Sequence, residues 1–442
     1  MYPRWYRMMF ALVVITTVLL TACGGTQSTP GTNVSGDVTQ LDPSKKYTVD
    51  FWEVFATGAN KTAMEALTKQ YMQQHPNITI NLQAFDSYGT LQTKLNAAIA
   101  AHKTPALSQV YESWAVQYKQ HDNIVSLQPY IKGKNGLSQS DLTDFYPSLL
   151  KDGQIDGEQY MLPFNKSNEV VYYNADVLQK HNIAPPTSLN DLIADLSKVT
   201  KPDGSQWGLS LTPSVDEWEI QYKALGGKDF VSSDGQKSAF AQDPNKQYAK
   251  AALETLAPFV KQNVVHVTQQ FAWQNDFAAQ KSVFAVSTIA SYPFLVKSIN
   301  GAFKFNELPI PAGPAGQYTP LFGTNLVLYK GVSDDTRAAA WDYLKFLTGT
   351  DADVSFVKQT GYMPVRQSAY NNKVLQDYYT QFPARKVGPQ QINNSFVDST
   401  QPNWQKCRED ITNNYVSVLK GQASSDTALS KMEQQCNDDL AG

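Results

Sequence analysis

The chain has 442 residues with 42% hydrophobic content, which is too long for one compact core and long enough for two lobes. Its formal net charge is −3, and its Lys and Arg residues are scattered without runs. A nucleic-acid-binding protein needs a basic field, so this charge distribution excludes nucleic acid as a partner.

The first 22 residues have the pattern of an export signal. Two arginines precede the apolar run Met8–Leu20, which is shorter than the roughly 20 residues that span a bilayer. The run ends in Leu20-Thr-Ala-Cys23, which resembles a bacterial lipobox and implies that Cys23 is the lipidated first residue of the mature protein. An uncleaved membrane anchor is the alternative interpretation. Residues 23–43 are rich in Gly, Ser, Thr and Pro, which predicts a flexible tether at the outer face of the cell membrane.

The next segment alternates strand and helix patterns. Its apolar spacing predicts strands at 47–54, 78–82 and 107–111 and helices at 63–74 and 91–99. This order predicts a mostly parallel sheet, and such sheets bind ligands beyond the carboxyl ends of their strands. Tyr88 follows the second strand and Glu112 follows the third, so both are candidates for ligand contact.

The segment Gln159–Asn174 is the first expected crossing between two lobes. Asn165, Ser167 and Asn168 run directly into the apolar and aromatic residues 170–173, which favour a buried strand. The pattern Pro163-Phe-Asn-Lys-Ser-Asn-Glu-Val-Val-Tyr-Tyr-Asn resembles the hinge strand of solute-binding proteins of carbohydrate-type ABC importers, most closely those that bind glycerol 3-phosphate. In that family a hydroxyl of this strand contacts the ligand, which implies this role for Ser167.

The rest of the chain alternates helix and strand again. Helices are expected at 175–180, 189–200, 217–225, 245–260 and 271–280, and strands at 206–211 and 282–287. Residues 303–329 are interpreted as a return to the first lobe. Helices at 334–347, 351–360, 404–419 and 425–440 close the chain.

The resemblance implies an α/β fold of the type II periplasmic-binding-protein class. Each lobe would be a mostly parallel sheet with flanking helices, and hinge crossings would join the lobes. The expected organisation is a signal peptide at 1–22, a lipidated tether at 23–43, an N-terminal lobe of 44–166 plus 304–329, and a C-terminal lobe of 167–303 plus 330–442.

The resemblance also implies a set of ligand-binding positions. The motif Lys358-Gln-Thr-Gly-Tyr-Met-Pro matches the family, and the register of 416–421 places an arginine of the C-terminal helix. The implied set is Tyr88, Glu112, Ser167, Thr288, Gly323, Tyr362 and Arg408. An arginine fork suits two phosphate oxygens, and an ionised glutamate suits the neighbouring hydroxyls of a glycerol unit. Glycine lets the backbone approach the ligand closely.

Each of these residues also has an ordinary structural interpretation. Glu112 is a typical surface residue after a strand, and Tyr362 suits core packing. Arg408 has acidic neighbours at Glu409 and Asp410 with which it can pair, and Thr288 can cap a helix.

Two features depart from the family pattern. Lys166 adds a charge beside Ser167. Pro213 and Asp216 stand where the family has a pair of tryptophans, with Trp218 nearby, which implies room for a larger ligand such as a glycerophosphodiester.

Cys407 and Cys436 are the cysteines that remain after the lipobox. Export places them in an oxidising compartment, which favours a disulfide over two free thiols. The histidines stand apart without ligand spacing, so no metal or other cofactor is expected.

The expected function is capture of glycerol 3-phosphate or a glycerophosphodiester by hinge closure, followed by delivery to a membrane permease. The protein would be a monomer without catalytic activity. One alternative keeps this role for a sugar or oligosaccharide, which would stack on Trp207, Trp218, Trp273 or the Tyr172-Tyr173 pair. Another is an exported hydrolase, but the sequence contains no nucleophile elbow, HExxH motif or Walker loop.

Overall fold

The computed structural model describes residues 37–441 except residues 398 and 402. The predicted signal peptide and Cys23 lie outside the described residues. Residues 37–43 belong to the first lobe rather than to the predicted tether, because Thr39 is buried and its hydroxyl accepts a hydrogen bond from the Asn135 backbone at 3.0 Å. Within the described part of the chain, no helix combines the length and apolarity needed to cross a membrane.

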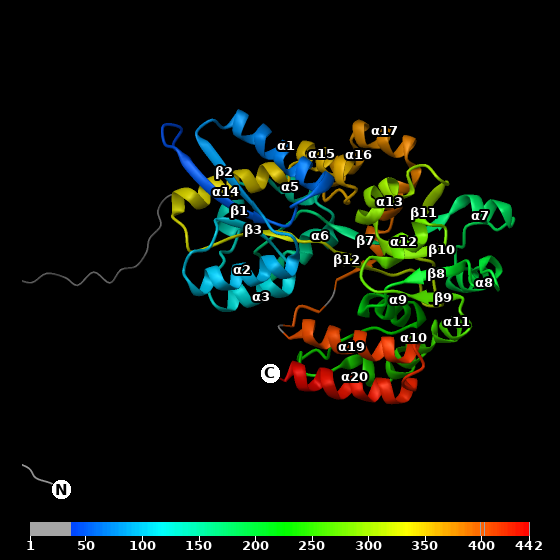
Figure 1. The fold of residues 1–442 in the computed structure, drawn as a ribbon. Coiled ribbons are helices and arrows are strands. Elements are labelled where there is room, and N and C mark those ends of the chain that lie inside the picture. The colour runs from blue at the N-terminus through cyan, green and yellow to red at the C-terminus, as the bar shows by residue number, and fades with distance from the viewer. Residues whose placement is uncertain (1–36, 398, 402, 442) are drawn as a thin grey trace, which may run out of the picture. The chain divides into compact units, whose positions relative to one another are not determined.

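The first lobe is built on a five-stranded sheet in the order β2-β1-β3-β13-β6 (Figure 1). Its strands are β1 (Tyr47–Glu53), β2 (Ile78–Ala84), β3 (Leu107–Val110), β6 (Leu162–Pro163) and β13 (Asn325–Leu328). The first three strands are parallel, as their order predicts. β13 is antiparallel to both β3 and β6, so the sheet is mixed rather than uniformly parallel.

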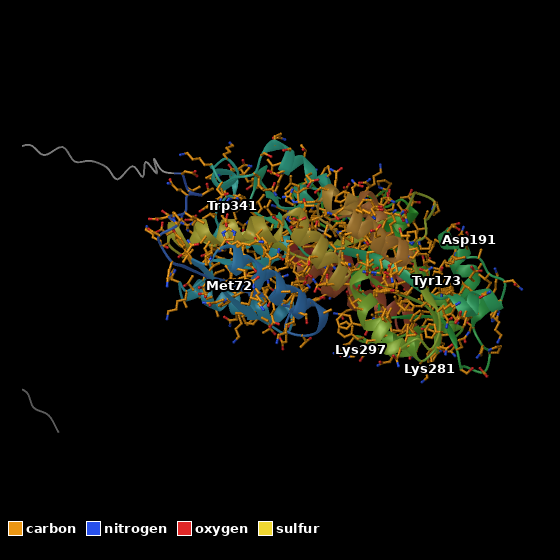
Figure 2. The ribbon with its side chains drawn as sticks, turned by 90° about the horizontal axis from the view of Figure 1, so that it is seen from above. Met72, Tyr173, Asp191, Lys281, Lys297 and Trp341 are labelled. Atoms are coloured by element: carbon orange, nitrogen blue, oxygen red, sulfur yellow. A yellow bond between two sulfur atoms is a disulfide. The ribbon has the colours of Figure 1, made fainter. Side chains whose placement is uncertain are left out.

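Helices accompany this sheet, together with a hairpin that forms a separate two-stranded sheet. They are α1 (Gly58–Gln74), α2 (Tyr88–Ala100), α3 (Glu112–Gln120), α4 (Gln128–Ile131), α5 (Gln139–Asp144), α6 (Pro147–Asp152), α14 (Asp334–Leu347), α15 (Thr350–Thr360), α16 (Gln367–Asn371) and α17 (Lys373–Gln381), with the hairpin β4 (Gln154–Ile155) and β5 (Glu158–Gln159). Trp341 of α14 is fully buried and donates from its indole N–H to the Asn135 carbonyl at 2.9 Å. Seen from above, Trp341 and Met72 mark this lobe, and Tyr173, Asp191 and Lys281 mark the other (Figure 2).

The second lobe contains a seven-stranded sheet in the order β14-β12-β7-β10-β8-β9, with β11 also paired to β7. Its strands are β7 (Ser167–Asn174), β8 (Trp207–Leu211), β9 (Val265–Val267), β10 (Ser282–Thr288), β11 (Phe305–Pro309), β12 (Thr319–Phe322) and β14 (Ser395–Phe396). All eight residues of β7 are buried, which confirms the predicted buried strand. β8, β9 and β10 are parallel, whereas β7 is antiparallel to β10, β11 and β12.

The helices of this lobe surround the second sheet and end the chain. They are α7 (Ala175–Lys180), α8 (Leu189–Val199), α9 (Val215–Leu225), α10 (Lys246–Glu254), α11 (Ala257–Lys261), α12 (Ala272–Ala278), α13 (Tyr292–Ile299), α18 (Val387–Gln390), α19 (Trp404–Leu419) and α20 (Ser425–Leu440), with 3-10 turns at Ala239–Ala241, Ile289–Ser291, Pro383–Lys386 and Ile392–Asn394. The single helix predicted at 245–260 is two helices, because Pro258 has no N–H for a continuing helix and instead occupies the first turn of α11.

The division predicted after residue 303 is wrong in two places. β11 and β12 do not return to the first lobe but pair with β7, whose edge would otherwise leave backbone groups unpaired. Only β13 of that segment joins the first sheet. α14 and α15 pack against β1 and α1, so they belong to the first lobe rather than the second (Figure 1).

α19 and α20 lie side by side and are joined by the Cys407–Cys436 disulfide. The bond closes a loop with a sequence separation of 29 residues.

Replacing both cysteines by serine is expected to lower the free energy of unfolding by about 3 kcal/mol, because the unfolded chain regains the freedom that the loop restricts. Urea denaturation of the wild type, the double variant and the reduced wild type tests this expectation, which equal midpoints would contradict.

Candidate ligand-binding site

A cavity of about 520 Å³ lies between the two lobes. Tyr88, Tyr111 and Glu112, at the starts of α2 and α3, line its first-lobe wall, and Asp216 of α9 and Arg408 of α19 line the second-lobe wall. The other lining residues are Gly89, Gln92, Ser113, Trp114, Pro320, Leu321, Phe322, Val397, Ser399, Trp404, Gln405 and Glu409. Side chains that are distant in sequence therefore meet at one cavity, as the sequence predicts for Tyr88, Glu112 and Arg408.

Tyr362 lies one layer behind the cavity wall. Its hydroxyl is hydrogen-bonded to the Tyr88 hydroxyl and to the side-chain amide of Asn165, and its ring stacks on Phe356 with centroids 5.6 Å apart. Asn165 also donates to the Tyr88 hydroxyl at 2.9 Å. In this arrangement Tyr362 positions Tyr88. Direct contact between Tyr362 and a ligand stays a prediction.

Ser167, Gly323 and Thr288 are not among the described residues that line the cavity. Ser167 is buried at the start of β7 and pairs with Phe322 of β12. Gly323 has φ of +91°, and a Cβ there would lie 1.9 Å from the Asn165 carbonyl oxygen, so glycine is required where the two hinge crossings touch. Thr288 ends β10, and its carbonyl accepts from the Tyr172 hydroxyl at 2.8 Å.

Lys166 forms a buried network with Glu112. Its ammonium lies 2.9 Å from Glu112 Oε1 and 2.6 Å from Asp152 Oδ2, and Asn325 donates to the same two oxygens. Burial and then Asp152 raise the pKa of Glu112 to about 8, against the opposing effect of Lys166. Burial also disfavours the charge on Asp152, but Lys166 outweighs it and holds the pKa of Asp152 below its ordinary value. Oε1 of Glu112 therefore already accepts hydrogen bonds from Lys166 and Asn325 within the protein, an arrangement that the sequence does not suggest.

Arg408 is paired across the second-lobe wall. Its Nη2 lies 2.5 Å from Asp216 Oδ1 and its Nη1 lies 3.5 Å from Glu219 Oε1, rather than beside Glu409 or Asp410. Asp216, noted in the sequence as a departure from the expected family pattern, is therefore a partner of Arg408.

Further carboxyl groups lie buried behind this pair. Burial raises the pKa of Glu219 to about 8, and burial followed by the charge on Asp216 raises the pKa of Glu217 to about 7. Burial and the neighbouring carboxylates raise the pKa of Glu169 on β7 well above its ordinary value. Asp216 lies nearer to the Arg408 guanidinium than Glu219 does, so it is the main partner of Arg408 in this wall.

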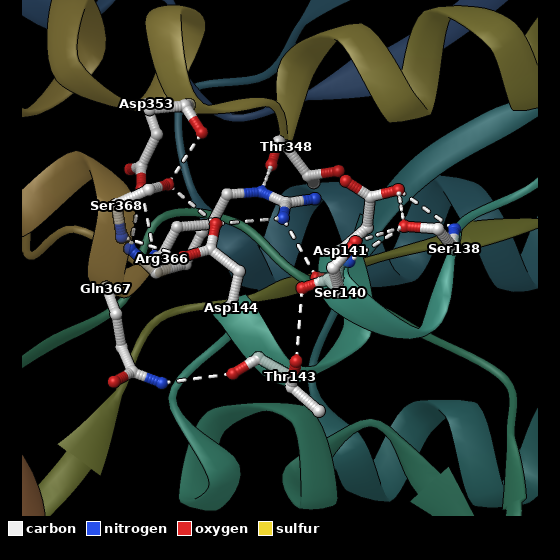
Figure 3. Close-up of polar contacts among 12 residues, drawn as sticks. Ser138, Ser140, Asp141, Thr143, Asp144, Thr348, Asp353, Arg366, Gln367 and Ser368 are labelled. Atoms are coloured by element: carbon white, nitrogen blue, oxygen red, sulfur yellow. Dashed lines mark hydrogen bonds and ion pairs between the residues drawn. The ribbon is translucent and has the colours of Figure 1, made fainter.

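The turn that carries Tyr362 is held by two buried arginines. Arg366 donates to the Asp141 carbonyl at 3.0 Å, to Asp144 at 3.2 Å and to the Thr348 carbonyl (Figure 3). Arg385 donates to the carbonyls of Gly361 and Ile289 at 2.5 and 3.1 Å. The turn is therefore fixed on both sides before any ligand binds.

The aromatic residues of the wall differ from those proposed for sugar stacking. Trp218, Trp273 and Tyr172 are buried in the cores, and Trp207 stacks on His266 outside the cavity. Tyr111 instead lies between Tyr88 and Trp114, with ring centroids 5.0 and 5.3 Å away. The sequence reasoning missed Tyr111 and Trp114, although both flank Glu112 at the end of a predicted strand.

Comparison with known proteins agrees with this architecture. Residues 66–384 match the bacterial extracellular solute-binding proteins, and the chain belongs to that family. It is therefore the extracytoplasmic solute-binding protein of an ABC importer and not an enzyme.

Individual relatives are more distant. The sn-glycerol-3-phosphate-binding periplasmic protein UgpB of Rhizobium meliloti is 22% identical over 423 residues, covering 88% of this chain and 93% of the relative. The structure of UgpB from Mycobacterium tuberculosis in complex with glycerophosphocholine has a TM-score of 0.77 at 19% identity, covering 89% of this chain and 98% of that one. The GacH receptor of Streptomyces glaucescens, solved unliganded and with acarbose, gives the same TM-score, identity and coverage. These likenesses confirm the predicted two-lobed fold.

Proposed function

We propose that the chain is a lipid-anchored, monomeric receptor that captures a small polyhydroxylated solute by hinge closure and delivers it to a membrane permease. The observation that carries this proposal is the cavity whose walls come from both lobes. A ligand that contacts both walls favours the closed form, because only that form makes both sets of contacts. The pattern before Cys23 supports the lipid anchor.

The ligand class that the geometry supports best is a neutral sugar or short oligosaccharide. The described wall contains Glu112, Asp216 and Glu409 but only one cationic side chain, Arg408. Its aromatic rings offer flat apolar faces for a sugar, and its polar groups offer hydrogen bonds to hydroxyls.

The second candidate ligand is glycerol 3-phosphate or a glycerophosphodiester. Arg408 lies in the cavity wall, where an arginine fork suits phosphate oxygens. The relative of Rhizobium meliloti named for sn-glycerol 3-phosphate also supports this candidate.

Titration monitored by tryptophan fluorescence separates the candidates, because Trp114 and Trp404 line the cavity. Maltose, maltotriose, glycerol 3-phosphate and glycerophosphocholine are the test ligands. The first candidate predicts a response to a sugar that Tyr111→Ala weakens roughly tenfold, about 1.4 kcal/mol, and that Arg408→Ala leaves nearly unchanged. The second predicts a phosphate response that Arg408→Ala abolishes.

Tyr318→Ala is the matched control, because Tyr318 does not line this cavity. A titration in which none of these compounds binds the folded protein would contradict both candidates.

A further inference from the structure

The pairing of Arg408 with Asp216 is built into the wall of the cavity. The two side chains are 17% and 16% exposed, so both reach the cavity surface, and they come from α19 and α9. A guanidinium binds phosphate through N–H groups aimed at two oxygens. Here Asp216 lies at 2.5 Å from Nη2, and Glu219 lies at 3.5 Å from Nη1.

Asp216 is held in place independently of Arg408. Its Oδ2 accepts from the Ser214 hydroxyl at 2.8 Å, and Ser214 also caps the start of α9. An acidic residue in the first turn of a helix is stabilised by the unpaired N–H groups there. The carboxylate is therefore in position before a ligand arrives, and a ligand anion has to displace it.

The first-lobe wall also has its charges paired within the protein. The charge of Lys166 lies 2.9 Å from Glu112 and 2.6 Å from Asp152, so the acidic network of the first lobe is compensated from within the protein. Glu409 adds a further acidic side chain to the second-lobe wall. In the described part of the wall, a phosphate group entering the cavity thus meets acidic side chains, and the cation there, Arg408, already lies beside Asp216.

We infer that Asp216 is a specificity-determining residue that occupies Arg408 in place of a ligand anion, so that the cavity rejects phosphorylated solutes and accepts neutral polyhydroxylated ones. The inference rests on the proposed function, because it concerns the ligand class of the same cavity.

The test is a gain of binding. Asp216→Asn keeps a side chain that can accept from Ser214 but removes the negative charge beside Arg408. The variant is expected to bind glycerol 3-phosphate roughly 10- to 100-fold more tightly than the wild type, because a charge-assisted hydrogen bond becomes available to the ligand. Isothermal titration calorimetry of the full mature chain measures both affinities, and a thermal melt verifies that the variant is folded.

Glu409→Gln is the matched control, since it removes the same charge from the neighbouring wall position without touching the Arg408–Asp216 pair. The inference requires that Glu409→Gln gives a much smaller gain in affinity for glycerol 3-phosphate. It also requires that the double variant Asp216→Asn/Arg408→Ala loses the gain seen in Asp216→Asn. Equal affinities of the wild type and Asp216→Asn, or a gain that persists without Arg408, would overturn it. A gain in Asp216→Asn together with no binding of any sugar by the wild type would support the role of Asp216 while refuting the proposed sugar ligand.

Discussion

Replacing Lys166 by methionine is expected to lower the free energy of unfolding by about 3–5 kcal/mol. The ammonium is buried and is hydrogen-bonded to Glu112 and Asp152, which themselves lie against each other. Methionine fills a similar volume but leaves two buried carboxyl groups without their cation. Breaking one side of a buried ion network costs more than the network contributes, because the remaining charges lose their compensation.

The loss is expected to grow with pH. Lys166 lowers the pKa of both Glu112 and Asp152, so its removal raises both folded-state values. A carboxyl group with a raised folded pKa contributes stability that is fully present below its unfolded pKa of about 4 and is lost as pH rises through the folded pKa. The variant is thus closest to the wild type near pH 4 to 5 and furthest from it at pH 8 to 9.

Urea denaturation at pH 5 and pH 8 measures both effects. Lys330→Met is the matched control, because Lys330 pairs with Asp122 on the surface of the same lobe and both side chains are more than half exposed. Exposed pairs contribute about 0–1 kcal/mol, so this control stays near the wild type. If the two variants lost similar stability, Lys166 would not be neutralising the buried acids.

The helices at the end of the chain could be predicted to the residue from the sequence. α14, α19 and α20 have the expected bounds, and of the two candidate caps, Ser333 and Asp334, it is Ser333 that caps α14 by accepting from the Thr336 backbone. Local signals suffice there because a cap and an apolar stripe both act within a few residues. By contrast, the apolar pattern at 305–322 predicts strands but does not indicate which sheet edge they join. Their assignment depends on the open edge of β7, which lies far away in sequence.

The candidate site was predictable in part for the same reason. Tyr88 and Glu112 follow from the rule that ligands bind beyond strand ends, and Arg408 followed from the family motif. The charged partners of these residues could not be predicted from the sequence. Lys166 is 54 positions from Glu112 and Asp216 is 192 positions from Arg408, so only the folded chain reveals that both departures from the family pattern are charge partners of site residues.

Replacing Arg385 by leucine is also expected to cost about 3–5 kcal/mol of unfolding free energy. The Arg385 and Glu307 side chains are 2% and 0% exposed, with 2.6 Å between Nη1 and Oε1. Arg385 also donates to the carbonyls of Ile289 and Gly361, next to Thr288 and Tyr362. Its loss leaves one buried charge and two buried carbonyls unsatisfied, and it releases the turn behind Tyr88, so ligand affinity falls together with stability.

A double variant distinguishes the charge from the carbonyl contacts. Burial raises the pKa of Glu307 to about 7 even though Arg385 opposes it, so Arg385→Leu raises this pKa further and its cost is greatest at alkaline pH. Arg385→Leu/Glu307→Leu removes both charges, and a buried ion pair replaced by apolar residues of similar volume is often neutral for stability. Urea denaturation of the single and double variants at pH 8 is therefore expected to show recovery of most of the loss in the double variant. If the double variant is no more stable than the single one, the loss of stability comes from the unsatisfied carbonyls of Ile289 and Gly361. Arg385 would then stabilise the fold chiefly by hydrogen bonding to the two segments behind the cavity.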